Sequence, residues 1–359
     1  MLTDYIKAAR IKSRGTVYRA SHELFRVFYA RFYYRIGPCY YSLFGLSDTP
    51  ISEWKNYILD RESNPIVRSV NRRENIPLAV NKILFAEHLL ENDLPTIPIL
   101  FVIHEKDAGF SRAFRSISDK YQFFAALDRA PDRMFAKLMN GAHGEGAFSI
   151  SRLSDKRWRF GERTGSGEEL FEFCQQRIDG KRGLIVQPAI RPHSLLNAVM
   201  GPNSLGTVRA ITYLSLGGPK LMLPLLRMPA GGNVTDNFSE GAAGNIVAKV
   251  DIETGVLGCG KMARSKSWPE IMKVDRHPDT GVRIRGFQLP YWQETISLML
   301  NAQASTPQLR TLGWDIAITD KGPIIVEANT GYDANLLQVA YGRGVRGDLA
   351  PIFDLRQAS

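Results

Sequence analysis

Residues 313–333 constrain the fold of this chain more than any other stretch, because they read as two short strands joined by a polar turn. Apolar and polar side chains alternate from Trp314 to Ile318, as in a strand with one buried face. The turn occupies 319–322, and a second apolar run begins at Pro323. The stretch therefore predicts a β-hairpin.

Three oxygen-bearing side chains on this hairpin have the spacing of a metal site. Alternation places Asp315 on one face of the first strand, while Glu327 and Asn329 share a face of the second. If the strands pair symmetrically about the turn, the three side chains converge within reach of one ion. Two carboxylates and an amide oxygen are hard ligands, which suit Mg²⁺ on nucleotide phosphates and do not suit zinc. On this stretch alone, the alternative is a hairpin whose carboxylates face water.

A net charge of +10 over 359 residues favours an anionic partner, such as a nucleotide, a phosphorylated substrate, an anionic lipid or a nucleic acid. We expect no nucleic acid, because the chain has neither zinc-finger spacing nor an RNP-type aromatic strand motif. The length favours two or three lobes. Three widely separated cysteines predict buried thiols in a reducing compartment. No transmembrane segment or secretory signal is indicated, so we expect a cytoplasmic protein, with a membrane-peripheral location as the alternative.

The first 80 residues supply +6 of this charge, with 13 Lys and Arg against 7 Asp and Glu. Within them, 17–46 reads as a helix that ends at Gly37-Pro38. One interpretation is a helix docked on the body with solvated arginines; the other is contact of residues 1–46 with an anionic membrane. Residues 47–75 read as an irregular connector. The aromatic stripe of the helix is Phe25, Phe28, Tyr29, Phe32, Tyr33 and Ile36, with Arg26, Arg31 and Arg35 between them.

A glycine-rich loop follows a short strand over 133–139. Its three glycines allow the backbone to approach an anion and present N–H groups to phosphate, and Lys137 on the strand can reach the same phosphates. His143 reads as a loop residue more than as a general base. The absence of a following helix argues against a Walker-type P-loop or a dinucleotide fingerprint. On its own the loop is a weak signal. The glycines are Gly141, Gly144 and Gly146.

The remaining segments predict a mixture of helices and strands. Arg209 lies on an expected hairpin over 206–226, and Arg227 follows it. Two interpretations are open for two arginines in the interior of a sheet. They pair with carboxylates of the protein, or they contact a phosphate or an acyl phosphate of a ligand. A second hairpin is expected over 247–258. Helices are expected over 81–92 (capped by Asn81), 117–129, 168–179 and 291–303, and buried strands over 94–103 and 184–190, the latter interrupted by Pro188.

Taken in order, these elements resemble the ATP-grasp superfamily, and most closely its sugar-transfer-associated, glutamate-ligase-related branch. The motifs that carry the resemblance are 313–319, Gly322-Pro323, 327–330, 277–281 and 207–209. The resemblance covers roughly 75–345 and implies an α+β fold, the ATP-grasp fold, in which two α/β lobes clasp ATP, here with an N-terminal helical extension. The expected division is an extension over 1–75, an N-terminal lobe over 76–130, a glycine-flap lid with the adenine hinge over 131–190, a C-terminal lobe with the Mg²⁺ site over 191–350, and a tail over 351–359.

The resemblance also implies roles for residues. Lys137, with Lys82 as a weaker candidate, would contact nucleotide phosphates, and Arg209 would neutralise the transferring phosphoryl group. Two positions depart from the pattern: Gln187 stands where many relatives have glutamate, and Asn81 where aspartate is common. The implied set is Arg209, Arg227 and Lys137 for catalysis; Lys82, Lys137, Gly141, His143, Gly144, Gly146, Gln187, Pro188, Ala189 and Ile190 for ATP; Asp315, Glu327 and Asn329 for metal; and Asn233, Tyr332 and Asp333 for substrate.

The activity that the resemblance implies is an ATP-dependent carboxylate–amine or carboxylate–thiol ligase that forms an acyl phosphate and releases ADP and phosphate. ATP and one or two Mg²⁺ ions, or Mn²⁺, would be its cofactors, and a glycan, peptide or small-molecule acid and an amine its substrates. A homodimer is a further expectation. The alternatives are an ATP-grasp phosphotransferase acting on a hydroxyl, and a non-catalytic protein that binds an anionic ligand.

Overall fold

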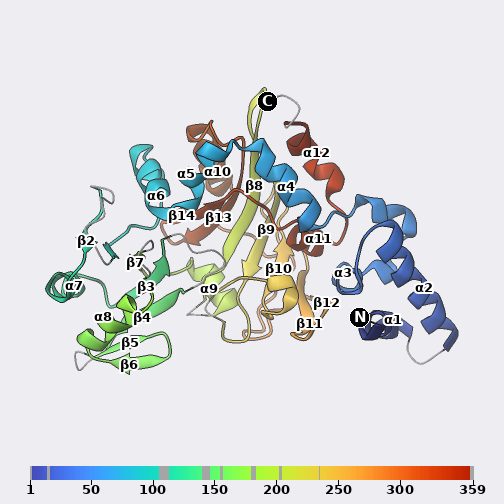
Figure 1. Ribbon diagram of the computed structural model, residues 1–359, viewed down its shortest axis with the longest axis horizontal. Coiled ribbons are helices and arrows are strands. Elements are labelled where there is room, and N and C mark those ends of the chain that lie inside the picture. The colour runs from blue at the N-terminus through green and yellow to red at the C-terminus, as the bar shows by residue number, and fades with distance from the viewer. Residues whose placement is uncertain are drawn as a thin grey trace. The chain divides into compact units, whose positions relative to one another are not determined.

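Two structural units make up the chain in the computed structural model, which describes residues 2–13, 17–104, 113–139, 146–153, 157–178, 183–201, 204–233 and 235–355 (Figure 1). Unit 1 comprises residues 1–73, 192–323 and 329–359, and unit 2 comprises 74–191 and 324–328. No helix in the described ranges is both long and apolar enough to cross a membrane.

An antiparallel sheet forms the centre of unit 1, with the strand order β12-β11-β10-β9-β8-β13-β14; of its last strand, β14, residues 324–328 are assigned to unit 2. The hairpin predicted over 313–333 is confirmed as its last two strands. In sheet order the bounds are β12 Trp268–Val274, β11 Gly260–Ser265, β10 Ile246–Lys249, β9 Gly218–Met228, β8 Thr207–Ser215, β13 Thr311–Thr319 and β14 Gly322–Asn329. Helices of the same part of the chain are α9 Ser194–Met200, α10 Trp292–Ser305, α11 Ala334–Tyr341 and α12 Arg346–Asp354.

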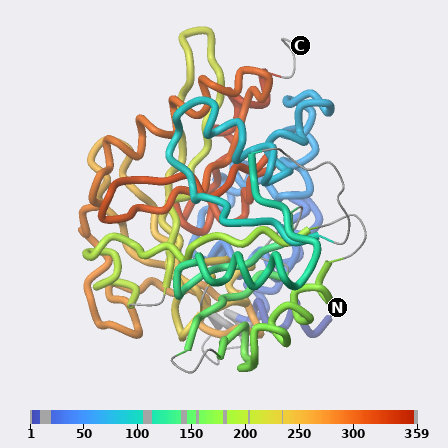
Figure 2. The backbone as a smooth tube through the Cα atoms, turned by 90° about the vertical axis from the view of Figure 1, so that its left-hand side faces the viewer, coloured from blue at the N-terminus to red at the C-terminus, as the bar shows by residue number. Residues whose placement is uncertain are grey.

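The β8–β9 hairpin sets which side chains face each other in the middle of this sheet. Its tip protrudes as the yellow-green loop at the top of Figure 2. Ser215 pairs with Gly218 and Ile211 with Met222, but Arg209 pairs with Leu225 and Thr207 with Arg227, so the register shifts by one residue between them. Leu223 has a φ of +51° at this shift, as expected of a β-bulge. Because a one-residue slip exchanges the two faces of a strand, the bulge decides that Arg227 lies opposite Thr207.

The expected hairpin over 247–258 is only partly formed. Residues 246–249 form β10, whereas 254–258 contribute an isolated bridge between Val250 and Leu257. The partner of β10 on its other side is instead β11, through Val247 and Lys261.

The expectation of an irregular connector over 47–75 is wrong. This stretch contains the short 3-10 helices η1 Leu46–Asp48 and η2 Ile51–Asn56, and the α-helix α4 Asp60–Val70. Pro65 lies on the exposed side of α4, while Val67 and Val70 are buried, so the apolar face outweighs the helix-breaking residue. Asn71 then fixes the segment to β13, since its side chain donates to the Thr311 carbonyl and accepts from the Thr311 amide.

Only part of the aromatic stripe packs on the protein: Tyr29 and Ile36 contact the core, whereas Phe25, Phe32 and Tyr33 are exposed. Helix α2 Val17–Tyr33 also buries Val27 and Ala30, whose small side chains allow close packing, and Glu23, which accepts a hydrogen bond from the Tyr41 hydroxyl. Gly37-Pro38 does mark the break, because Pro38 begins α3 Pro38–Leu43. Helix α1 Leu2–Ser13 packs on α2, with the Tyr5 and Phe28 rings stacked at 4.6 Å. The N-terminal helices thus join the main core of unit 1, which includes Trp54, Leu336 and Ile352.

Unit 2 is built on a second sheet, with the order β2-β1-β7-β3-β4-β5-β6. We expected a boundary between two lobes at residue 130. In the structure, strands from both sides of residue 130 belong to this one sheet, because β7 pairs with β1 on one side and with β3 on the other. The helices expected over 81–92, 117–129 and 168–179 are confirmed. The bounds are β1 Phe101–Ile103, β2 Ser116–Ile117, β3 Arg133–Leu138, β4 Phe148–Arg152, β5 Trp158–Phe160, β6 Arg163–Gly165, β7 Leu184–Pro188, α5 Ile76–Val80, α6 Lys82–Glu91, α7 Lys120–Leu127 and α8 Gly167–Gln175.

Candidate functional site

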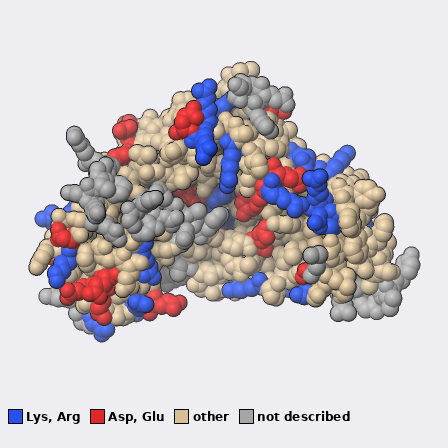
Figure 3. Space-filling model, viewed as in Figure 1, with Lys and Arg blue, Asp and Glu red and all other residues tan. Residues whose placement is uncertain are grey.

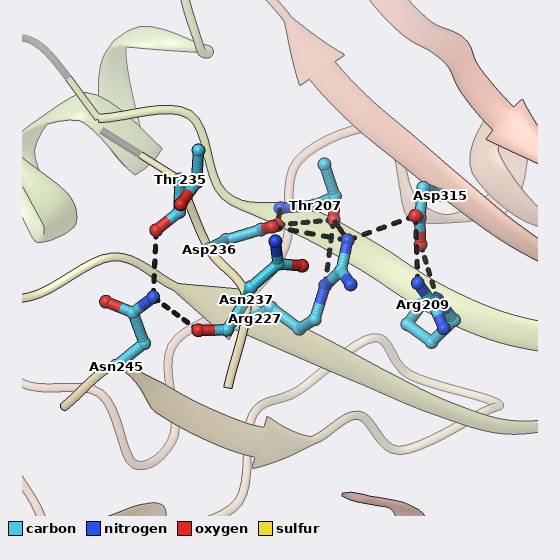
Figure 4. A network of polar contacts seen from close by, with 8 residues as sticks. All are labelled: Thr207, Arg209, Arg227, Thr235, Asp236, Asn237, Asn245 and Asp315. Atoms are coloured by element: carbon cyan, nitrogen blue, oxygen red, sulfur yellow. Dashed lines mark hydrogen bonds and ion pairs between the residues drawn. The ribbon is translucent and has the colours of Figure 1, made fainter. Parts of the chain in front are cut away.

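A strip of charged side chains crosses the three central strands of unit 1 (Figure 4). Arg209 on β8 and Asp315 on β13 are direct cross-strand partners, and the guanidinium binds the carboxylate with two hydrogen bonds, from Nε to Oδ1 and from Nη2 to Oδ2 at 2.9 Å. Asp315 is 1% exposed. A two-pronged pair of this kind fixes the orientation of the carboxylate as well as its charge.

Arg227 on β9 extends the strip through Thr207, its cross-strand partner on β8. Its Nη2 lies 3.1 Å from Oδ2 of Asp315 and 2.7 Å from the Thr207 hydroxyl, to which it donates. Thr207 and Arg209 are two residues apart on one strand, so their side chains share a face of the sheet. This alternation explains why two separate cross-strand pairs merge into one network.

Asp236, in the loop after β9, supplies the second carboxylate of the strip. Its Oδ2 accepts from the amide and the hydroxyl of Thr207 at 2.9 and 2.5 Å, and its Oδ1 lies 3.3 Å from Nη2 of Arg227. Burial raises the pKa of Asp236, and Arg227 opposes the rise. Two guanidinium groups and two carboxyl groups therefore compensate each other where unpaired charges would be costly. Sequence reasoning missed Asp236 and the role of Thr207, because both depend on the bulged register.

Asn329 approaches Asp315's strand at Gly313. A Cβ at Gly313 would lie 3.7 Å from the Asn329 carbonyl oxygen and 3.8 Å from its Cβ, in ordinary contact. Nδ2 of Asn329 is buried and has no hydrogen-bond partner among the described residues. An amide with an unsatisfied end has either a donor for a phosphate oxygen or, turned over, an oxygen for a cation. This orphaned group fits a site for phosphate and a hard metal ion.

Carboxylates alone do not form a metal cage in this structure. Within the described ranges, no group of three or more His, Cys, Asp or Glu side chains is placed to hold an ion. The expected ligand set does not require one, because it combines two carboxylates with the Asn329 amide. Each carboxylate oxygen has two acceptor positions, so Asp315 keeps acceptor capacity beside its arginines.

One face of the unit 2 sheet collects several of the residues expected to bind ATP. Lys137 on β3 is the cross-strand partner of Ile185 on β7, and Phe135 is that of Gln187. Side chains two apart share a face, so Lys137 and Gln187 lie on the face of Ile185. Ile185 packs there with Ile83 of α6, whereas the opposite face carries the main core of the unit. Lys137 is half-buried.

Lys82 begins α6 beside the end of β3. Its amide donates to the Met139 carbonyl at 3.4 Å, and Asn81 caps the helix by accepting from the amides of Ile83 and Leu84. Burial lowers the pKa of Lys82, while the nearby carboxylate of Glu327 acts in the opposite direction. The structure thus brings Lys82 and Glu327, both of unit 2, within electrostatic reach of each other.

The glycine loop is described only at its end. Gly141, His143 and Gly144 lie outside the described residues. Gly146 has a φ of +67°, a conformation that favours glycine, and a Cβ there would approach the Leu138 side chain to 3.1 Å.

The hinge strand has specific ties to its neighbours. Gln187 is buried, and its Nε2 donates to the Ile97 carbonyl at 3.1 Å. The amide of Ala189 donates to the Arg133 carbonyl at 2.9 Å, and Pro188 has no N–H. Ile190 is half-buried. Neither of the first two backbone positions after Gln187 therefore has an N–H left for adenine.

The residues expected to contact substrate have structural partners in unit 1. Asn233 donates to the Ala243 carbonyl at 2.9 Å and to Oδ1 of Asn245 at 2.7 Å. Asn245 itself holds the loop by donating to the carbonyls of Thr235 and Asn237. Tyr332 lies in the core and its hydroxyl contacts Thr311; burial raises the pKa of this tyrosine. Tyr332 is therefore a core residue and does not lie at an exposed edge of a pocket.

Asp333 faces a second carboxyl group. It caps α11 by accepting from the Leu336 amide at 2.8 Å, and Asp60 at the start of α4 lies beside it. Burial, and next the negative charge of Asp333, raise the pKa of Asp60 to about 8. Asn335 links this pair to the loop after β9, with its amide hydrogen-bonded to Asp60 and its Nδ2 3.0 Å from Glu240. No sequence signal pointed to Asp60, because it lies in the stretch that reads as a connector.

A buried arginine–carboxylate strip on an antiparallel sheet, together with a separate lysine-bearing unit, agrees with the class of protein implied by the sequence motifs. The chain belongs to the sugar-transfer associated ATP-grasp family, whose model matches residues 61–353. The match confirms the resemblance and the α+β ATP-grasp fold, and supports ATP binding and ligase activity in general.

Comparisons with individual proteins are less informative. Curated proteins gave no match. Among solved structures, the chain is similar to D-alanyl-alanine synthetase A from Vibrio cholerae (12% identity, 80% of this chain and 68% of that one, TM-score 0.46). It is also similar to D-alanine–D-alanine ligase from Bacillus anthracis (10%, 82% and 75%, 0.46) and to phosphoribosylamine–glycine ligase from Thermotoga maritima (10%, 80% and 57%, 0.46). These similarities are low, and the family match alone carries the assignment.

Proposed function

We propose that this protein is an ATP-dependent ligase that joins a carboxylate to an amine, or to a thiol, through an acyl phosphate. The observation that carries the proposal is the strip of Arg209, Arg227 and Asp315 in a chain that the family model matches over 61–353. A carboxylate does not accept an amine at neutral pH, because its leaving oxygen is too basic. Transfer of a phosphoryl group to it creates a good leaving group, and such transfer depends mainly on positioning and charge neutralisation.

In the first step, an oxygen of the substrate carboxylate attacks the γ-phosphorus of ATP, and the bond to the bridging oxygen of ADP breaks. Arg209 and Arg227 have fixed positions on adjacent strands, so they can face the developing negative charge without reorganisation. Lys137, with Lys82 as a second candidate, would hold the nucleotide phosphates from unit 2, and the segment 185–190 would lie along adenine.

Asp315, Glu327 and Asn329, on consecutive strands of one hairpin, would hold the divalent ion that accompanies ATP. A bound Mg²⁺ or Mn²⁺ would supply charge neutralisation on the phosphates. The arginines orient the Asp315 carboxylate, which a ligand to such an ion requires.

In the second step, the amine nitrogen attacks the acyl carbon, the bond to phosphate breaks, and the amine proton leaves with solvent or the phosphate. Asp333 and Asn233 are proposed to border the acceptor in unit 1, with Asp60 beside Asp333. The description of the family as sugar-transfer associated supports the proposal of a sugar-linked or peptide-linked acid as substrate. A cytoplasmic location is the corresponding proposal.

Trapping of the acyl phosphate tests the proposal. The purified chain is incubated with ATP, Mg²⁺, hydroxylamine and a panel of sugar acids and amino acids, and hydroxamate and ADP are measured. We expect acid-dependent hydroxamate with an equal amount of ADP, and its loss in Lys137→Met but not in the exposed control Lys220→Met. A stable phosphorylated product without hydroxamate would instead establish a phosphotransferase. ATP binding without turnover of any acid or hydroxyl compound would favour a non-catalytic binding protein.

A further inference from the structure

The outer face of α2 is aromatic and has no covering element among the described residues over much of its length. Phe25, Phe32 and Tyr33 are 64, 74 and 73% exposed, although such side chains are usually buried. Phe25 and Phe32 are seven residues apart, two helical turns, so they project from the same side. The rings contact one another along the helix: Phe28 stacks on Phe32, and the Tyr29 and Tyr33 rings are tilted with centroids 4.3 Å apart. The helix therefore presents a continuous apolar ridge.

An arginine-lined pocket lies at the C-terminal end of this ridge. It has a volume of about 460 Å³ and is lined by Arg31, Phe32, Arg35, Arg61 and Glu62. Arg61 donates to the carbonyl of Arg35, and Arg35 has a φ of +57°. Glu62 is paired with Arg346 at 3.1 Å.

The pocket keeps a net positive charge. None of its three guanidinium groups forms an ion pair within the described ranges, whereas Glu62 is already neutralised from outside by Arg346. Figure 3 shows Lys and Arg side chains on the right of the view, with Asp and Glu side chains beside them. An anion with several oxygens, such as a phosphate, is the natural ligand for clustered guanidinium groups.

Much of the net charge of the chain lies in the N-terminal segment 1–46, of which residues 20–46 contribute three Arg and one Glu. Residues 1–46 contain eight Lys and Arg and two Asp and Glu, a difference of +6, so the other 313 residues carry only +4 of the +10. A basic segment with exposed aromatic rings matches an anionic lipid surface in both respects, since the rings suit the headgroup boundary and the charges suit lipid phosphates.

We propose that residues 20–46, together with Arg61, form a docking surface for an anionic phospholipid membrane. Phe25, Phe32 and Tyr33 enter the headgroup boundary, and Arg31, Arg35 and Arg61 bind lipid phosphate in the pocket. Aromatic insertion and electrostatic attraction to an anionic membrane reinforce each other, so the two features together support binding better than either does alone. The surface lies outside the strip of Arg209 and Asp315, so it localises the protein without entering its chemistry.

Vesicle co-sedimentation of the full chain tests the proposal. Vesicles of phosphatidylcholine alone are compared with vesicles that also contain phosphatidylglycerol, at low and high salt. We expect binding only to the anionic vesicles, weakened by salt because the attraction is screened. The triple variant Arg31→Gln/Arg35→Gln/Arg61→Gln should bind less tightly on the order of tenfold or more, as should Phe25→Ser/Phe32→Ser/Tyr33→Ser.

Matched controls separate this surface from general effects. Lys220→Gln/Arg283→Gln/Arg285→Gln removes the same charge from exposed positions elsewhere, and Tyr121→Ser/Leu216→Ser removes exposed apolar side chains. Both should bind vesicles as the unchanged chain does. Near-ultraviolet circular dichroism reports the folding of the N-terminal arm, residues 1–46, because Trp54 is fully buried between Tyr34 and Tyr41 of this arm.

Three results would overturn the proposal. One is equal binding to neutral and anionic vesicles, or no binding to either. Another is an equal loss of binding in the control variants. The third is a change of oligomeric mass in the aromatic variant, measured by light scattering, without a change in vesicle binding; that outcome would make the ridge an interface between copies of the chain. If a multiple variant changes the near-ultraviolet circular dichroism, its substitutions are tested one at a time. Each single variant must then show part of the loss of vesicle binding.

Discussion

Arginine has opposite environments in two regions of unit 1. In the strip across β9, β8 and β13, Arg209 and Arg227 are paired with the carboxyl groups of Asp315 and Asp236. In the N-terminal arm, the pocket arginines are exposed and have no carboxylate partner within the described ranges. The buried region is therefore nearly neutral, and the surface region carries the charge. A net charge of +10 consequently says more about the arm than about the proposed catalytic strip.

The largest effect is expected at the centre of the buried region. Asp315→Asn keeps the shape of the side chain but leaves Arg209 and Arg227 without their shared carboxylate. Removing one partner of a buried ion pair costs about 3–5 kcal/mol of unfolding free energy. Loss of the oriented charge should also lower ADP formation by on the order of 10²–10³.

Urea unfolding and ADP release measure the two effects of Asp315→Asn. The matched control is Asp320→Asn in the turn of the same hairpin, where the carboxylate is exposed and accepts from the Ser194 amide. It should change stability by less than about 1 kcal/mol. If both variants unfolded at the same urea concentration as the unchanged chain, the strip would contribute nothing to stability.

A third arrangement of charged groups in unit 1 differs from both regions, because Asp60 faces another carboxyl group, that of Asp333. The pKa of Asp60 is raised to about 8 by burial and by Asp333, against an unfolded value of about 3.9. Between these pH values the folded state holds a proton that the unfolded state has released. Stability should therefore fall as the pH rises from about 4 to 8. Asp60→Asn removes this titration. The unfolding free energy of the variant should therefore fall less steeply with pH, and at pH 9 it should exceed that of the unchanged chain by about 1–3 kcal/mol.

Thermal or urea unfolding over a pH series measures this slope. Asp251→Asn is the control, because hydrogen bonds from Thr254 hold the pKa of Asp251 below its usual value and this exposed group titrates under the tested range. An unchanged slope in Asp60→Asn would show that another group dominates the titration.

How far the sequence predicts this molecule depends on whether a feature is local. Alternation around Asp315 and the turn at 319–322 are local, and both predict the hairpin that the structure contains. The family motifs then give the fold. The partners of Arg227 are not local: they depend on a bulge at Leu223, which shifts the register by one residue and leaves no distinct pattern in the sequence. The metal, ATP and substrate assignments stay predictions.

The N-terminal arm shows a different limit. An aromatic stripe at helical spacing indicates one apolar face, but it cannot show whether that face meets the protein or something outside it. In α2 the inward face is Val27 and Ala30, stabilised by Arg26, whose Nη2 donates to the carbonyls of Leu46 and Thr49, each at 2.8 Å. The Thr49 carbonyl belongs to the stretch that reads as a connector, and Leu46 directly precedes that stretch. The orientation of α2 therefore follows from a segment whose own fold the sequence did not reveal.

The smallest effect is expected in the exposed region. Arg31→Gln/Arg35→Gln should change the unfolding free energy by no more than about 0.5 kcal/mol, because exposed charges without partners contribute little to stability. Arg26→Gln, from the inward side of the same helix, should cost about 1–3 kcal/mol, since it removes two hydrogen bonds to the carbonyls of Leu46 and Thr49 and takes the guanidinium from the Trp54 ring. Urea unfolding of both variants provides the comparison. If the outer pair proved as destabilising as Arg26→Gln, those arginines would be part of the packing of the arm, and their role in membrane docking would lose its main support.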